Sequence, residues 1–382
     1  RRRRRRSVCL FNKMLPLDCD KHVKAKLETR GVRSAEEALK KSELDVIELI
    51  DVSLEKASKA LRQIAKGACP KPINAFQMKE KSAGQKGGNF IKTGVKTLDE
   101  ALLGGVPVGT ITEFVAPAGS GKTQMCLGLV AQTCAPKNFG GLDASVVFVD
   151  TEQTFSSNRL AEIAKKRFPE IYDKDYYKDG NNNNSVSNFG GMDKDAEMRL
   201  EKLLAEKVFV VTPQSLQELK VRIENLKPAL TQSDAKLIVI DSVARLARAE
   251  GGIGAGSSSS ESLVKRQNIL SSIAAALKRH AEQLNVAVVV TNQVTTNTNI
   301  NSNYHNSNDP AKANMVSRDS QVAAALGTKW AHCVNVRISM SGAIDGKADG
   351  KREMRVVKSP RTALSRFLYR ITASGCASID ID

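Results

Sequence analysis

The stretch ITEFVAPAGSGKTQ, residues 111–124, decides the fold that this sequence predicts. A strand is expected at 111–115 and an apolar helix near Gln124, with a phosphate-binding loop between them. In such a loop, backbone N–H groups and the positive end of a helix dipole face a polyphosphate. Lys122 would reach the β- and γ-phosphates, and the Thr123 hydroxyl would hold Mg²⁺. The loop consists of Ala116, Pro117, Ala118, Gly119, Ser120, Gly121, Lys122 and Thr123.

One loop position departs from the pattern G-x-x-x-x-G-K-[ST], because Ala116 replaces the first glycine. That position only begins the turn, so we expect the substitution to be tolerated. A pattern this short also arises by chance. The strand before it, the helix after it and further site residues downstream decide for nucleotide binding.

Three downstream strands end in side chains that suit a nucleotide site. Asp241 is a candidate Mg²⁺ ligand, with a helix-capping role as its alternative. Glu152 is the candidate that polarises an attacking water, whereas Asp150, two residues earlier, also has a structural interpretation. Gln293 carries an amide that can sense a γ-phosphate, or else satisfy the local backbone.

Apolar runs alternate with helical patterns over most of the chain, which predicts an α/β fold with a mostly parallel sheet flanked by helices. Buried strands are expected at 111–115, 144–150, 207–212, 236–241 and 286–293. Helices are expected at 159–168, 215–226 and 262–284. The C-terminal part adds strands, expected as antiparallel extensions, at 333–341, 353–358 and 366–373.

The chain before this core is organised differently. Residues 1–14 form a basic tail that is either solvated and disordered or an arm for nuclear import or DNA contact. Residues 15–68 predict a small all-α domain, in which 47–64 suits a helix-hairpin-helix that touches DNA phosphates. Its turn lacks glycine and Asp51 would repel phosphate, so a packing or protein-contact role stays open. Residues 69–90 have linker composition.

The ATPase domain is expected at 91–382 and contains three low-complexity segments, near 173–195, 251–260 and 297–317. The second and third are expected to follow directly the carboxyl ends of parallel strands. That edge is where α/β sheets bind ligands.

The composition indicates which classes of partner the protein has. The 382 residues include 58 Lys and Arg against 41 Asp and Glu, a net charge of +17. This balance indicates a polyanionic partner, nucleic acid ahead of a membrane surface, with a merely solvated basic surface as the alternative. The seven cysteines form no C-x-x-C pair, which indicates reduced intracellular thiols. No apolar run approaches the ~20 residues of a membrane span, so no membrane partner is expected.

Together these motifs resemble the RecA/RadA recombinase family. The matching segments are Leu98-Asp99, Gly104-Gly105-Val106, the phosphate loop with Gln124, Asp150-Thr151-Glu152, Arg159-Leu160, Asp241-Ser242 and Thr291-Asn292-Gln293. Within that family the chain is most similar to the B-type branch of the eukaryotic recombinase paralogues. That match is carried by Gly140-Gly141-Leu142, Ala161-Glu162-Ile163-Ala164, Ala324-Ala325-Leu326-Gly327, Trp330-Ala331-His332, Val334-Asn335 and Lys358-Ser359-Pro360.

The resemblance implies a RecA-like ATPase core that binds ATP and Mg²⁺ between neighbouring subunits. It implies that Arg159 lies along the adenine and that Pro360 faces a neighbour's nucleotide. It also implies that the loops after Asp241 and Gln293 line a channel for single-stranded DNA, with double-stranded DNA as a further candidate. The implied activity is slow, DNA-stimulated ATP hydrolysis in the nucleus, in homologous-recombination repair of double-strand breaks.

One departure from the family bears on assembly. Self-polymerising members carry Phe-x-x-Ala in the linker, whereas Lys79 follows Phe76 here at the position of the small residue. A hetero-oligomer with other paralogues, assisting the main recombinase, is therefore expected rather than a homofilament. The alternatives are a strand-exchange enzyme, a scaffold with structural ATP, and a RecA-fold ATPase without a DNA role.

Overall fold

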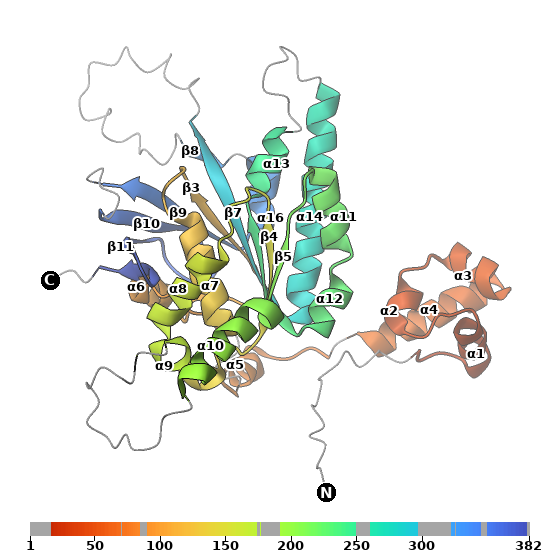
Figure 1. Ribbon diagram of the computed structural model, residues 1–382. Helices are drawn as coiled ribbons and strands as arrows, with labels where there is room; N and C mark the ends of the chain where they lie inside the picture. The colour runs from red at the N-terminus through yellow and green to blue at the C-terminus, as the bar shows by residue number, and fades with distance from the viewer. Residues whose placement is uncertain are drawn as a thin grey trace, which may run out of the picture. The chain divides into compact units, whose positions relative to one another are not determined.

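The computed structural model describes residues 17–69, 71–84, 90–173, 176, 192–249, 260–296, 322–324, 326–344 and 350–379 (Figure 1). The chain divides into two compact units, residues 1–84 and 85–382. The basic tail 1–14, the segment 297–317 and most of 173–195 and 251–260 lie outside the described residues.

The first unit is all helical. Its helices are α1 Lys21–Thr29, α2 Ala35–Leu39, α3 Glu43–Ile50, α4 Leu54–Ala68 and α5 Ala75–Gly84. Helix α3 starts at a capping box formed by Ser42 and Asp45 and ends at Asp51, whose φ of 48° turns the chain. Ser53 then caps α4, so these two packed helices form the hairpin expected over 47–64. Leu27, Val46 and Ile64 are buried between the helices.

The stretch 69–90 is more ordered than its linker composition suggests, because it contains α5. The Asn74 side chain accepts a hydrogen bond from the Gln77 N–H at 2.8 Å, and the Gln77 side chain accepts one from the Asn74 N–H at 3.1 Å. This reciprocal pair satisfies two backbone donors at the start of the helix. Linker composition therefore does not exclude a capped helix in this stretch.

The second unit is built on a ten-stranded sheet with the order β12-β11-β10-β9-β3-β7-β6-β4-β5, and β8 pairs with β7. A two-stranded sheet of β1 and β2 accompanies it. The strands are β1 Phe90–Ile91, β2 Val106–Pro107, β3 Ile111–Ala116, β4 Ser145–Asp150, β5 Val208–Val211, β6 Ala235–Asp241, β7 Ala287–Thr296, β8 Val322–Ala324, β9 Val336–Ala343, β10 Arg352–Lys358, β11 Ser365–Thr372 and β12 Gly375–Ser378.

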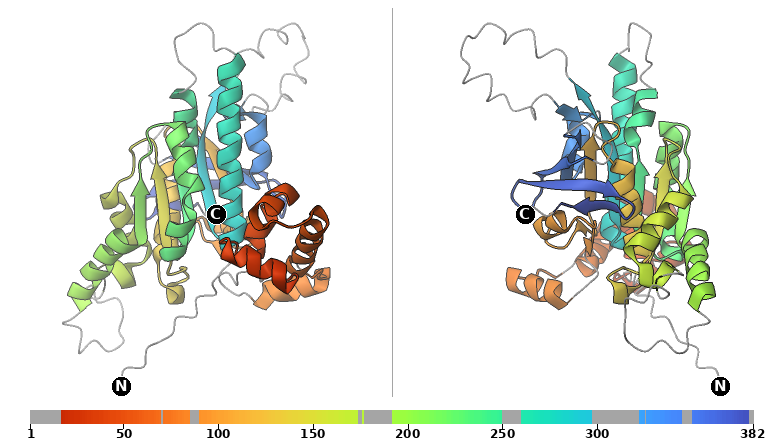
Figure 2. Two further views of the ribbon diagram at one scale, coloured as in Figure 1. Left: turned by 90° about the vertical axis from the view of Figure 1, so that its right-hand side faces the viewer. Right: turned by 60° about the vertical axis from the view of Figure 1, so that its left-hand side comes forward.

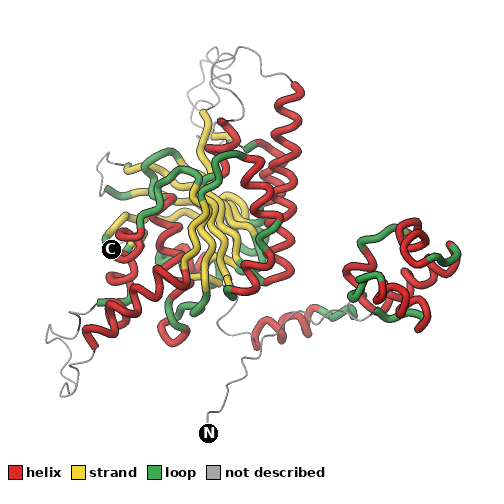
Figure 3. The backbone as a smooth tube through the Cα atoms, turned by 45° about the vertical axis from the view of Figure 1, so that its right-hand side comes forward, coloured by secondary structure: helices red, strands yellow, loops and turns green. Residues whose placement is uncertain are grey.

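Helices cover both faces of this sheet, as Figures 2 and 3 show. The helices are α6 Lys96–Ala101, α7 Lys122–Cys134, α8 Ser157–Arg167, α9 Pro169–Tyr172, α10 Met192–Lys202, α11 Leu216–Glu224, α12 Lys227–Gln232, α13 Val243–Ala249, α14 Ser260–Leu284 and α16 Gly327–Cys333, with short turns at Lys137–Phe139 and Leu203–Lys207. The expected fold class, a mostly parallel sheet between helices preceded by an all-α unit, is confirmed.

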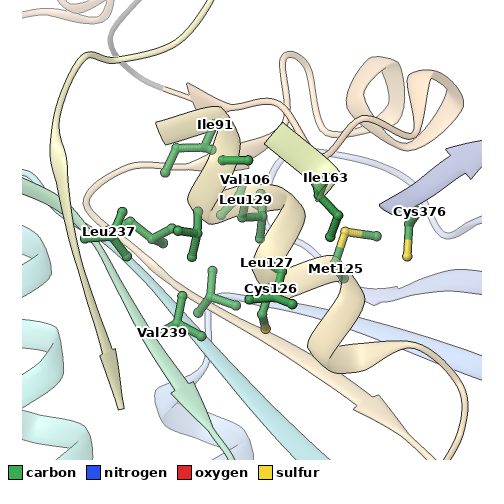
Figure 4. Packing of buried hydrophobic residues seen from close by; sticks show 14 of the residues in the cluster. Ile91, Val106, Met125, Cys126, Leu127, Leu129, Ile163, Leu237, Val239 and Cys376 are labelled. Atoms are coloured by element: carbon green, nitrogen blue, oxygen red, sulfur yellow. The ribbon is translucent and has the colours of Figure 1, made fainter. Parts of the chain in front are cut away.

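The strand side chains alternate between two apolar layers, as the period of two in a strand requires. Phe114 and Phe148 pack with α7 and α8 in one layer, part of which is shown in Figure 4. Ile111 and Val149 pack with α11, α13, α14 and α16 in the other. The sheet is therefore buried on both faces at its centre.

Several expectations about individual elements were wrong. β9 runs parallel to β3 and is not an antiparallel extension of it, whereas β10, β11 and β12 follow β9 in antiparallel pairs. The edge strand β5 is not buried, since Phe209 and Val210 are each 42% exposed. Helix α13 separates β6 from the segment that begins at Gly251, which therefore does not follow the strand directly.

The close approach at Gly141 generates a stability prediction. A Cβ there would lie 1.9 Å from the Ala135 carbonyl oxygen, so Gly141→Ala must displace backbone. We expect it to lower the free energy of unfolding by about 2 kcal/mol, seen as a lower Tm in calorimetry. Gly342→Ala is the matched control, because its Cβ would meet nothing within 4 Å. Equal Tm values for the two variants would contradict the close packing.

Candidate functional site

The carboxyl ends of four neighbouring parallel strands carry the site residues. β7, β6 and β4 follow β3 in the sheet, so the phosphate loop, Glu152, Asp241 and Gln293 emerge at one edge. The strand order is not the chain order, and the carboxyl ends of such strands are where α/β sheets bind ligands. The sequence thus placed four separate motifs at a common edge.

The phosphate loop leaves β3 and enters α7, which begins at Lys122, two residues before the expected start. Gly119 and Gly121 have φ values of 77° and 90°, a conformation that glycine adopts without strain. The Lys122 ammonium donates to the carbonyl oxygens of Ala116 and Pro117 at 3.0 and 2.8 Å. Burial lowers its pKa, and the nearby carboxylates of Asp241 and Glu152 oppose that shift.

A side chain outside the motif secures the loop. The Tyr369 hydroxyl on β11 donates to the Ser120 carbonyl oxygen at 2.6 Å, and burial raises the pKa of that phenol. The Ser120 hydroxyl is buried without a partner among the described residues. The loop is therefore fixed through its backbone and retains unused hydrogen-bonding capacity.

The candidate metal ligands Thr123 and Asp241 meet directly. The Thr123 hydroxyl donates to one Asp241 oxygen at 2.6 Å, and the Thr291 hydroxyl donates to the other at 2.5 Å. Burial raises the pKa of the Asp241 carboxyl, and these two hydrogen bonds oppose the shift. A hydroxyl beside a carboxylate is an oxygen donor set that suits Mg²⁺.

Glu152 and Gln293 also meet. The Gln293 side-chain amide donates to Glu152 Oε1 at 3.2 Å, and the Ser242 hydroxyl donates to the same oxygen at 2.5 Å. Asp150, by contrast, accepts the N–H groups of Thr154 and Phe155 at 3.2 and 2.9 Å. Asp150 thus holds the turn after β4, as its structural interpretation required.

The two candidates for the nucleoside end lie together, away from Pro360. Arg159 Nε donates to Gln124 Oε1 at 2.8 Å, and its guanidinium also donates to the Thr372 carbonyl oxygen at 2.6 Å. Pro360 follows β10, whose end pairs with the start of β9. Because β9 is parallel to β3, Pro360 lies at the opposite edge of the sheet, outside this chain's own site.

Sequence reasoning gave no role to three residues that support the site. Ser242 directly follows Asp241, and Thr291 precedes Gln293 by two residues on β7, so closeness in sequence was a usable signal. Tyr369 had none, because it lies about 250 residues from the loop it contacts. Only the folded sheet brings it there.

The described residues contain no group of three or more His, Cys, Asp or Glu placed to bind a metal. A Mg²⁺ at Thr123 and Asp241 would need further oxygens from elsewhere, as Mg²⁺ sites with substrate phosphates do. No disulfide bond joins the cysteines among the described residues. No helix in this part of the chain has the length and apolar content to span a membrane.

Comparisons with known proteins agree with this geometry. The Rad51 family model matches residues 89–183 and 193–379, and a model of the XRCC3/RpoA-like helix-hairpin-helix domain matches 17–68. The chain is 32% identical to DNA repair protein RAD51 homolog 2 of Arabidopsis thaliana, over 91% of this chain and 85% of that protein. It is 30% identical to the Homo sapiens protein of the same name, over 92% and 84%. The expected resemblance to the B-type paralogue is confirmed.

A more distant relative is the DNA repair protein XRCC3 homolog of Arabidopsis thaliana, which is 28% identical over 76% of this chain and 93% of that protein. The family match omits residues 184–192, which lie inside the low-complexity segment 173–195. The two family models together match residues in both units of the chain.

The raised pKa of Asp241 generates a pH prediction. The native state binds this proton more tightly than the unfolded chain, so the ionised carboxyl destabilises the native state above its native pKa. We expect Asp241→Asn to raise the Tm of the protein without nucleotide or Mg²⁺ at about pH 8. The gain should shrink as the pH falls toward the ordinary Asp value near 3.9. A lower Tm than wild type at every pH would contradict this.

Proposed function

The chain belongs to the Rad51 family, and from this premise we propose that it is a DNA-binding, DNA-stimulated ATPase that assists the main strand-exchange recombinase. Its place of action is the nucleus, in the homologous-recombination repair of double-strand breaks. The names of its relatives, which are DNA repair proteins, support this assignment. Other recombinase paralogues are its proposed partners in a hetero-oligomer.

The observation that carries the ATPase proposal is the convergence of five side chains at one sheet edge. Lys122, Thr123, Asp241, Glu152 and Gln293 come from four separate parts of the chain. Thr123 is hydrogen-bonded to Asp241, Gln293 is hydrogen-bonded to Glu152, and both carboxylates act electrostatically on the Lys122 ammonium. Buried carboxylates beside hydroxyls and an ammonium are costly to assemble for stability alone. A phosphate and metal site gives each of them a role.

The residues fit ATP with Mg²⁺. A Cβ at Gly119 would meet nothing within 4 Å, so the loop is open on that side. The buried Ser120 hydroxyl has no hydrogen-bond partner among the described residues and could bond a phosphate oxygen. Thr123 and Asp241 would hold the metal, and Lys122 would exchange its carbonyl partners for phosphate oxygens. Bound Mg²⁺ supplies neutralisation of phosphate charge.

Glu152 is the proposed base for the attacking water. Ser242 and Gln293 already hold one of its oxygens, which fixes the carboxylate in one orientation. Its other oxygen remains to orient a water and accept its proton. Gln124 and Arg159 are proposed to hold the nucleoside end, and Pro360 to face the nucleotide of a neighbouring subunit.

DNA contact is proposed at the same end of the sheet, where β6 and β7 lead into the two segments that the resemblance implied. Arg245 and Arg248 lie on α13, and Lys265 and Arg266 lie in the first turns of α14. Arg266 donates to the Ala247 carbonyl oxygen at 3.4 Å, which ties the two helices. Lys312 and Arg318, the basic residues of the second segment, lie outside the described residues. Contacts of these cations with phosphates give salt-sensitive binding with little sequence preference.

Two alternatives are separable by experiment. Exposed Lys79 on α5 stands where self-polymerising relatives have a small residue, which favours hetero-assembly over the strand-exchange alternative. Filaments of the isolated protein on single-stranded DNA in electron micrographs would reverse that preference. A Lys122→Ala protein that assembles normally and restores repair in cells would favour a scaffold with structural ATP.

We expect Lys122→Ala to weaken Mg-ATP binding about 100-fold, because it removes two charge-assisted hydrogen bonds worth about 3 kcal/mol together. Titration calorimetry measures the binding, and phosphate release with and without single-stranded DNA measures the activity. Lys166→Ala, at an exposed position on α8, is the matched control and should bind as wild type. Wild-type protein that binds no Mg-ATP, alone or with its paralogues, would disprove the proposal.

We expect Lys265→Ala to weaken binding of single-stranded DNA and to lower the slope of log affinity against log salt by about 0.7, the loss of one phosphate contact. Fluorescence anisotropy across a salt series measures both. Lys278→Ala makes the same charge change farther along α14, at an exposed position. Matching slopes for the two variants would place the DNA elsewhere.

A further inference from the structure

A second buried polar cluster lies in the sheet next to the site. Glu113, in the middle of β3, is completely buried. Its Oε1 accepts hydrogen bonds from the Asn292 side-chain amide at 2.8 Å and from the Trp330 indole N–H at 3.0 Å. Its Oε2 accepts from Arg337 Nε at 2.6 Å. One carboxylate therefore joins β3, β7, β9 and α16.

This cluster lies on the sheet face that is covered by α14 and α16, since Glu113 alternates with Phe114 of the opposite layer and Trp330 packs in the α14 layer. Glu113 and Arg337 are directly opposite each other in the β3–β9 register. A buried ion pair of this kind is weak evidence for stability, because apolar residues of similar volume often stabilise a core as well or better. A role other than stability accounts better for it.

The cluster is continuous with the nucleotide site. Asn292 Oδ1 accepts the backbone N–H of Gln293 at 2.8 Å. The Gln293 side chain in turn donates to Glu152. An unbroken chain of hydrogen bonds thus runs from Glu152 through Gln293 and Asn292 to Glu113, and from there to Trp330.

Helix α16 is attached to the same strand by a second route. β8, which immediately precedes α16, pairs with the end of β7, where Val294 opposes Ala324 and Thr296 opposes Val322. The end of β7 is therefore connected to α16 by two routes, the backbone of β8 and the side chain of Glu113. Figure 1 shows β7, β8 and α16 beside one another.

We propose that Glu113 is a positioning residue that couples Gln293 to Trp330, so that the nucleotide at the site sets the position of α16. The inference rests on the proposed function, because ATP must occupy the site. A shift of Gln293 moves Asn292, and Asn292 must keep its bond to Glu113 because a buried donor or carboxylate left unpaired is costly. Coupling of this kind requires that the hydrogen-bonded network has two discrete arrangements, one for each state of the nucleotide.

The chain provides its own reporter, because Trp330 is its only tryptophan. A ¹⁵N-labelled sample gives one indole N–H resonance, from the proton donated to Glu113. We expect this resonance to differ between protein with Mg-ADP and protein with Mg²⁺ and a non-hydrolysable ATP analogue. Asn292→Ala, which removes the link between Gln293 and Glu113, should reduce that difference by about half or more while the analogue still binds in the calorimeter.

Thr112→Val is the matched control. Thr112 precedes Glu113 on the same strand, is fully buried, faces the other layer, and has a hydroxyl without a partner among the described residues. Its variant should keep the full difference between the two nucleotides. Glu113→Gln is the second test variant, because it keeps the volume and changes only the charge and donor pattern, and it should also reduce the difference.

The outcomes separate the coupling from the proposed function. An indole resonance that is identical with both nucleotides, while the calorimeter shows that both bind, overturns the coupling alone. A full difference retained in folded Asn292→Ala or Glu113→Gln also overturns it. Absence of nucleotide binding in the wild-type protein overturns the proposed function and the coupling together.

Discussion

The two hydrogen bonds that Asp241 accepts, from Thr123 and Thr291, are the interaction on which the site depends. They fasten the first turn of α7 to the ends of β6 and β7, so the phosphate loop cannot move independently of the sheet. Burial disfavours the charge of this carboxyl, and the hydroxyls compensate only in part. A cation close to this carboxyl, either a divalent metal or an ammonium, would therefore stabilise its ionised form.

Buried hydrogen-bonded groups also connect elements elsewhere in the sheet. Its two faces bury apolar layers around α7 and α14, and the buried carboxylate of Glu113 lies in the middle of a strand with its hydrogen-bond partners on β7, β9 and α16. Asp241 and Glu113 each accept hydrogen bonds from more than one element of the fold. The rigid part of the second unit thus presents side chains that are already oriented, which reduces the entropy lost when a ligand binds.

The sequence predicts the parts of this structure that are local. The loop 116–123, the strand ends at Asp241 and Glu152, and the hairpin of the first unit follow from spacing, period and capping residues. The direction of β9, the exposure of β5 and the contact of Tyr369 with Ser120 do not, because strand order and partners are set by contacts between distant segments. The cap at Asn74 was readable in principle, but proline and glycine around it concealed the helix.

The six residues of β3 contribute to three different parts of the structure. It ends in the phosphate loop, places Phe114 among the side chains of α7, and places Glu113 against Arg337 and Trp330 on the other face. A slip of one position exchanges the faces of a strand. It would put a carboxylate into an apolar layer and a phenyl ring among hydrogen-bond donors. An insertion or deletion inside this strand would therefore break both layers at once.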